Sequence, residues 1–187
     1  MMNFKTLFSR ALLALALVSG SVFAGPMYHV SISTKSFSGD GGLELTYAGA
    51  GADLSTATLS NFGGAFGDVL DASGVTGGVD GTLSMSSAQS WLWQAVTFGG
   101  LFSFDIAFDG PSSGFDGTTF AVNLTQGQDY LVAGAAQIDL LPGAEPVVTA
   151  GDIALVTPAA DVPEPSTLLS VFTGIGLLGF TLRRRAR

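Results

Sequence analysis

The chain has 187 residues, 26 glycines, one histidine and no cysteine, and its formal net charge is −8. Disulfides and thiol chemistry are therefore excluded, and the usual nitrogen and sulfur ligands of a zinc site are missing. Basic residues are concentrated at both ends, so residues 25–182 contain one lysine and 15 acids, a net charge of −14. A segment this acidic should repel nucleic acid and attract cations.

The first 24 residues have the three-part layout of a secretory signal peptide. Lys5 and Arg10 precede an apolar run over residues 11–18, and small residues then lead to Ala24. Eight residues rise about 12 Å as a helix, far less than the roughly 30 Å of a bilayer's hydrocarbon core. We therefore expect signal peptidase to cleave after Ala24. We do not expect these residues to remain as a permanent membrane anchor.

From residue 25 onward the main pattern is an alternation of apolar and polar residues, which is typical of half-buried strands. It is plain over residues 28–34 and 43–47, and the turn residues over 38–42 predict a hairpin between them. Residues 102–108 place four large apolar side chains on one face and should lie at the centre of the core. Further strand candidates are 57–62, 83–85, 119–124, 130–133, 138–140 and 153–156.

Short strands separated by Asp-Gly turns, with no long apolar period near 3.6, predict an all-β domain. We expect an antiparallel β-sandwich of jelly-roll type over residues 25–156. The chain becomes looser after residue 141, and residues 157–162 are expected to form a linker.

Two tryptophans offer a candidate binding surface. Trp91 and Trp93 are two residues apart, so in a strand they share one face. If exposed, they would form a platform for stacking sugar rings, with Gln94 as a nearby hydrogen-bonding group. If buried, they would fill the core beside Phe98. The sequence favours burial, because a domain without disulfides needs large apolar side chains in its core.

Carboxylates are the abundant reactive groups of the chain. Asp68 with Asp71, and Asp109 with Asp116, are candidate calcium pairs, because hard cations take oxygen ligands from aspartates and loop carbonyls. The sequence contains neither the twelve-residue calcium loop nor the glycine-rich calcium repeat. A structural role in turns is therefore the leading interpretation, calcium is the alternative, and no other cofactor is expected.

Catalysis has little support in the sequence. His29 is the only histidine, and alternation places it on a polar strand face beside serines, where a solvated surface residue would also lie. A glycosidase would need two facing carboxylates, for which Asp105 with Asp109, or Glu44 with Asp40, could be recruited. Because such aspartates are ordinarily structural, we predict that the protein is not an enzyme.

Three features follow one another in the C-terminal tail, residues 163–187. They are the tripeptide Pro163-Glu164-Pro165, an uncharged apolar run over 166–182, and the arginines Arg183, Arg184, Arg185 and Arg187. The prolines keep the tripeptide extended and accessible to an enzyme. The apolar run is just long enough to cross a bilayer as a transmembrane helix, and the arginines should hold its end in the cytoplasm as a membrane stop.

This order of features resembles the PEP-CTERM sorting signal. The resemblance implies that an exosortase, a membrane-embedded cysteine transpeptidase, recognises Pro163-Glu164-Pro165 and cleaves nearby, after the helix has held the precursor transiently in the inner membrane. A plain single-pass anchor is the alternative. The mature domain is also similar to a module of uncharacterised PEP-CTERM proteins through residues 28–32, 58–62 and 102–105. That second likeness brings no known activity.

Together these patterns predict an exosortase-processed protein of the cell surface or extracellular matrix of a Gram-negative bacterium, with a structural, biofilm-associated role and no catalytic activity. The alternative is a carbohydrate-binding module that attaches extracellular polysaccharide to the cell surface. The two hypotheses differ in where they place Trp91 and Trp93, inside the sandwich or outside it.

Overall fold

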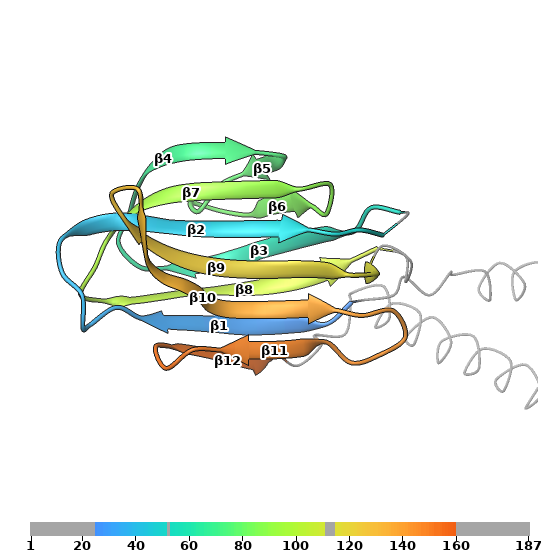
Figure 1. Ribbon diagram of the computed structural model, residues 1–187. Coiled ribbons are helices and arrows are strands. Elements are labelled where there is room, and N and C mark those ends of the chain that lie inside the picture. The colour runs from blue at the N-terminus through green and yellow to red at the C-terminus, as the bar shows by residue number, and fades with distance from the viewer. Residues whose placement is uncertain (1–24, 52, 111–114, 160–187) are drawn as a thin grey trace, which may run out of the picture. The chain divides into compact units, whose positions relative to one another are not determined.

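The fold is described from a computed structural model, over residues 25–51, 53–110 and 115–159. These residues form twelve strands, shown in Figure 1. The strands are β1 (Met27–Ser33), β2 (Asp40–Ala48), β3 (Thr56–Gly63), β4 (Phe66–Ser73), β5 (Val75–Gly77), β6 (Leu83–Ser86), β7 (Ser90–Thr97), β8 (Leu101–Asp109), β9 (Thr118–Gln126), β10 (Asp129–Leu140), β11 (Val147–Ala150) and β12 (Ala154–Pro158).

The strands form two six-stranded sheets in which every pairing is antiparallel. Sheet A has the order β12-β1-β8-β3-β6-β5, and sheet B has the order β11-β10-β9-β2-β7-β4. From β1 to β4 and again from β6 to β9, each strand lies in the opposite sheet to the one before it, which agrees with a jelly-roll-like connection. The predicted all-β architecture of antiparallel sheets is confirmed. The predicted C-terminal helix lies outside the described residues.

Period-two alternation explains why these segments pair as strands. In β8 the four large apolar residues from Phe102 to Phe108 are at most 1% exposed, whereas Ser103 and Asp105 take the outer face. β8 lies between β1 and β3 in sheet A, so its central position is confirmed.

One hydrophobic core joins the inner faces of the two sheets. Phe104 of sheet A meets Phe120 of sheet B with ring centroids 6.1 Å apart, and Phe108 meets Tyr47 at 5.8 Å. Such tilted and edge-on aromatic pairs add to the stabilisation that burial itself gives. The two sheets are thus held together mainly by apolar packing.

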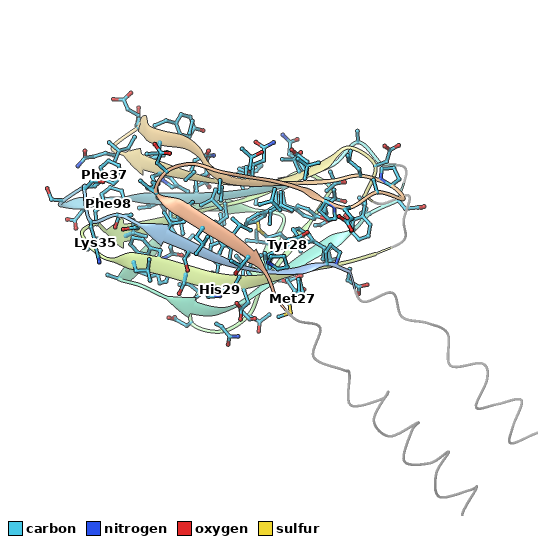
Figure 2. All side chains as sticks on the ribbon, turned by 90° about the horizontal axis from the view of Figure 1, so that it is seen from below. Met27, Tyr28, His29, Lys35, Phe37 and Phe98 are labelled. Atoms are coloured by element: carbon cyan, nitrogen blue, oxygen red, sulfur yellow. The ribbon has the colours of Figure 1, made fainter. Side chains whose placement is uncertain are left out.

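The hairpin expected between the first two strands is wrong. β1 pairs with β8 and β12, and β2 pairs with β7 and β9. The turn residues between β1 and β2 instead carry the chain from one sheet to the other. Thr34 is buried in this connection and donates its backbone N–H to the Gly100 carbonyl, while Phe37 packs on Phe98 at 6.0 Å. Lys35, Phe37 and Phe98 lie together at one end of the domain (Figure 2).

The strands outside the predicted candidates are β4, β5, β7 and β11. β4, β5 and β11 lie at sheet edges, and their residues are mostly exposed, so no apolar alternation marks them. β7 lies between β2 and β4, and both of its alternating sets contain large apolar residues. The candidates 130–133 and 138–140 belong to one strand, β10, whose pairing with β9 is interrupted by irregularities between Tyr130 and Ala136. β12 continues to Pro158, into the segment that the sequence assigned to the linker.

Candidate functional site

The side chains of β7 alternate in the opposite sense to the one that the sequence favoured. Leu92 and Val96 enter the core at 2% and 3% exposure, whereas Trp91 and Trp93 lie half-buried on the outer face of sheet B. The predicted burial of both tryptophans beside Phe98 is therefore wrong. Their predicted sharing of one strand face is confirmed.

Polar side chains with internal partners allow this orientation of β7. The Ser90 hydroxyl accepts the Ser86 backbone N–H at 3.0 Å and lies 2.8 Å from the Gly74 carbonyl. The Gln94 amide donates to the Gly67 carbonyl of β4 at 2.5 Å. Gln94 is 1% exposed and faces inward, so the prediction that it lies beside the tryptophans is wrong.

Trp93 lies across the neighbouring strand β2. Its indole Nε1 donates a hydrogen bond of 2.9 Å to the hydroxyl of Thr125 on β9, on the far side of β2. A Cβ atom at Gly42, the β2 residue between them, would collide with both Trp93 Nε1 and Thr125 Oγ1. The missing side chain at Gly42 therefore lets the indole rest against the sheet.

Trp91 reaches the other way, toward the edge strand β4. Its Nε1 donates to Asp71 Oδ2 at 3.0 Å, and Asp71 Oδ1 accepts the Ala72 backbone N–H at 2.9 Å. We call Trp91, Trp93 and the Gly42 backbone beneath Trp93 the tryptophan platform. It extends over β4, β7, β2 and β9, four adjacent strands of sheet B.

Polar groups border the platform on the same outer face. Glu44 of β2 is the cross-strand partner of Trp93, and its Oε2 accepts the Asn123 Nδ2 hydrogen at 2.8 Å. Asn123 Oδ1 in turn accepts the backbone N–H of Gly134 at 2.7 Å. Tyr130, which is 60% exposed, forms a hydrogen bond with Glu44, and the Glu44 carboxylate raises the pKa of the phenol. The rim thus offers carboxylate, amide and phenol groups beside the indoles.

The calcium candidates are distributed over separate elements. Asp68 and Asp71 lie on the edge strand β4, Asp109 ends β8, and Asp116 lies in the turn before β9. Asp71 already accepts hydrogen bonds through both oxygens. Within the described ranges, no group of three or more His, Cys, Asp or Glu residues could hold a metal ion. Calcium binding stays a prediction.

The outer face of sheet A carries a second polar cluster, which sequence reasoning missed. His29 Nδ1 lies 2.6 Å from Asp105 Oδ1, and its Nε2 lies 3.1 Å from Ser31 Oγ. Asn61 Nδ2 donates to the other oxygen, Asp105 Oδ2, at 2.7 Å. The hydrogen bonds from Asn61 and then from His29 lower the pKa of Asp105. Alternation placed His29 and Asp105 on outer faces, but only the pairing of β1 with β8 brings them together.

The comparison with protein families identifies the tail. Residues 161–185 match the model of the PEP-CTERM protein-sorting motif, which includes the tripeptide Pro163-Glu164-Pro165 and the first three arginines of the cluster. The tail and the predicted cleavage site at Ala24 lie outside the described residues. No curated protein and no solved structure matches the chain.

Across the described part of the chain, no helix has the length and apolar character needed to cross a membrane. The matched motif is a signal for export and for processing at the membrane by an exosortase, after which the protein is secreted or displayed at the surface. The chain therefore carries a PEP-CTERM protein-sorting motif at residues 161–185.

Proposed function

We propose that the mature domain binds polysaccharide of the cell surface or extracellular matrix through the tryptophan platform of sheet B. The observation that carries this proposal is the position of Trp91 and Trp93, half-buried on one outer face instead of enclosed in the core. This position favours the carbohydrate-binding alternative over a purely structural role. The sorting motif supports it, because it places the domain outside the cell, where such polymers occur.

The chemistry of the platform suits a sugar chain. The C–H faces of a pyranose ring stack on indole rings, and sugar hydroxyls need nearby donors and acceptors. Trp93 supplies a ring held by Thr125, and Glu44, Asn123 and Tyr130 supply the polar groups. These groups stand on paired strands, so their positions are largely fixed before a ligand arrives.

Charge narrows the class of polysaccharide. Glu44 and Asp71 border the tryptophans, and Asp139 lies further along the same face, bound to Thr119. Lys35 is the only lysine or arginine between residues 25 and 182. Uronic-acid polymers would therefore be repelled, whereas neutral or amino-sugar polymers would not. The proposed ligand is a neutral or cationic polysaccharide.

Processing at both ends would deliver the domain to this ligand. We expect signal peptidase to remove residues 1–24 and an exosortase to remove most of the chain after Pro165, following transient anchoring in the inner membrane. Intact-mass measurement of surface-extracted protein tests this sequence of events. Mature protein beginning at Gly25 without the arginine cluster is the expected product, and a recovered Arg187 would support a permanent anchor instead.

The binding proposal is tested with Trp91→Ala and Trp93→Ala, and with Leu155→Ala as the matched control. Leu155 is 62% exposed on β12 of sheet A, away from the platform. Retention on insoluble neutral and amino polysaccharides should fall at least about tenfold in each tryptophan variant, equivalent to about 1.4 kcal/mol, and stay unchanged in the control. Thermal melts establish that all variants are folded. Wild-type retention that survives both tryptophan replacements, or no retention by the wild type, would favour a structural matrix role.

A further inference from the structure

The cluster on sheet A has the connectivity of a nucleophile, a base and an orienting acid. Ser31 Oγ lies 3.1 Å from His29 Nε2, and the opposite ring nitrogen, Nδ1, lies 2.6 Å from Asp105 Oδ1. Both separations are within hydrogen-bond reach. His29 and Ser31 lie two residues apart on β1, so they share one face, and Asp105 is directly opposite His29 on β8.

The backbone next to the cluster supports an orienting role for Asn61. The pairing of β3 with β8 shifts register between Ser60 and Gly63, and within this irregularity Asn61 has a φ of 54°. Bulges redirect side chains, and a positive φ at a residue other than glycine carries a cost. Here the bulge brings the Asn61 amide to Asp105 Oδ2 at 2.7 Å. Asp105 thus has one oxygen on Asn61 and the other on His29.

This arrangement defines roles for the four side chains. A carboxylate on Nδ1 fixes the imidazole tautomer that leaves Nε2 free to accept the serine proton, and it stabilises the imidazolium that forms. His29 has a side-chain exposure of 45%, so a reactant from solvent can approach the cluster. His29 lies at the surface of the domain in Figure 2. The tryptophan platform lies on sheet B and includes none of these residues.

We propose that Ser31 is the nucleophile, and His29 the general base, of an acyl-transfer site for short-chain esters. Ser31 Oγ would bond to the ester carbonyl carbon, and its proton would pass to His29 Nε2 and then to the leaving alcohol as the C–O bond breaks. Water, activated by His29, would then release the carboxylic acid and restore Ser31. Asp105 and Asn61 are positioning residues that act through His29.

The surroundings of Ser31 indicate the class of ester. Its cross-strand neighbours are Ser103 on β8 and Leu155 on β12. Ser103 can offer a hydroxyl to the developing oxyanion, whereas one exposed leucine provides little apolar surface for a long acyl chain. An open sheet face accommodates an acetyl group that projects from a larger molecule. The site should therefore react with acetyl esters faster than with octanoyl esters.

The probes are 4-nitrophenyl acetate and 4-nitrophenyl octanoate, used with the mature domain and followed by nitrophenol release and peptide mapping. The wild type should react faster with the acetate and carry a transient acetyl group on Ser31. Ser31→Ala and His29→Gln should lower the rate by about 100-fold. Ser33→Ala, the next outer serine on β1, is the matched control and should react like the wild type.

Two further readouts separate catalysis from simple imidazole reactivity and from structural effects. Asp105→Asn should lower the rate of nitrophenol release, and Asp105→Glu should have a rate between that of Asp105→Asn and that of the wild type. The melting temperatures of the two Asp105 variants should be similar. Acetylation that persists in Ser31→Ala, or that maps to His29, would overturn the proposal. Equal rates for the wild type and Ser31→Ala would also overturn it.

Discussion

The outer faces of the two sheets carry different chemistry although both sheets line the same core. The outer positions of sheet A are mostly small and hydroxyl-bearing: Ser31, Ser33, Thr58, Ser60, Ser84, Ser86 and Ser103. Sheet B presents two indoles, a phenol and carboxylates instead. The inner faces are alike because both must consist of apolar side chains to form the core. The outer positions do not have to be apolar, so the difference between the two outer faces indicates function.

The largest expected effect is a loss of stability in β7, and it tests whether the tryptophans lie on the outer face. Leu92 and Trp91 are adjacent on β7, one 2% exposed in the core and the other half-buried outside. Leu92→Ala should cost about 2–5 kcal/mol of unfolding free energy, because it leaves a cavity between the sheets. Trp91→Ala should cost less despite its larger side chain. Urea unfolding of both variants measures the difference, and a greater loss in Trp91→Ala would contradict the comparison.

A comparison of β8 with β7 shows what the sequence could and could not predict. Alternation in β8 identifies its buried face, because the outward residues are polar. In β7 both alternating sets contain large apolar residues, Trp91 and Trp93 in one and Leu92 and Val96 in the other, so alternation alone does not decide between them. The choice depends on partners elsewhere in the domain. The Ser90 hydroxyl and the Gln94 amide N–H find such partners, whereas the buried Gln94 Oε1 has none among the described residues.

The candidate sites show a similar limit. Sequence analysis placed Trp91 and Trp93 on one face and identified His29 and Asp105 as outward residues. It could not predict that β1 pairs with β8, because His29 and Asp105 are 76 residues apart in the sequence. The bulge at Asn61 has no signal in the alternation either. Sequence periodicity therefore showed which residues share a face, and it identified the outer face where that face is polar. Long-range pairing determined the neighbours of each residue.

A second prediction compares the inner and outer faces of sheet B at high pH. Burial raises the pKa of Tyr47 to about 12, although its hydrogen bond with Ser55 acts in the opposite direction. Between pH 10 and 12 the unfolded chain releases this proton and the folded chain keeps it, so stability falls as pH rises. The loss from this group should be about 3 kcal/mol. Tyr130 is exposed and should contribute far less.

The measurement is the unfolding free energy at pH 9 and pH 12 for the wild type, Tyr47→Phe and Tyr130→Phe. Tyr47→Phe should be less stable at pH 9, because the Ser55 hydrogen bond is lost, but it should lose less stability on going to pH 12. Tyr130→Phe should follow the wild type. If Tyr47→Phe loses as much unfolding free energy between pH 9 and pH 12 as the wild type does, another group controls the loss of stability at high pH.

A third prediction concerns the glycine under the platform. Gly42→Ala should force Trp93 away from Thr125, because the added Cβ collides with both side chains. We expect a stability loss of about 1–3 kcal/mol and weaker retention on polysaccharide. Gly100→Ala is the control, because a Cβ there has open space and its φ is not positive. Fluorescence of Trp93 in a Trp91→Phe background reports the displacement, and unchanged emission would contradict the proposed contact.

The smallest expected effect concerns the cluster on sheet A at low pH. The Asn61 hydrogen bond is the main cause of the lowered pKa of Asp105, and the His29 hydrogen bond is the second. Since the folded-state pKa lies below the unfolded one, Asp105 stabilises the fold above the unfolded pKa. That contribution is lost as pH falls through the folded value. The effect is modest because 19% of the Asp105 side chain is still exposed to water.

Carbon-13 NMR titration of the Asp105 carboxyl group measures this contribution directly. Asn61→Ala should raise the pKa of Asp105 more than His29→Gln does, and acid unfolding should begin at a higher pH in the same order. Ser33→Ala, on the same face but outside the cluster, should leave the titration unchanged. If the pKa of Asp105 is the same in Asn61→Ala as in the wild type, Asn61 does not form its hydrogen bond with Asp105 in solution. The two faces would then still differ in composition, but sheet A would lack the fixed carboxylate on which its proposed chemistry depends.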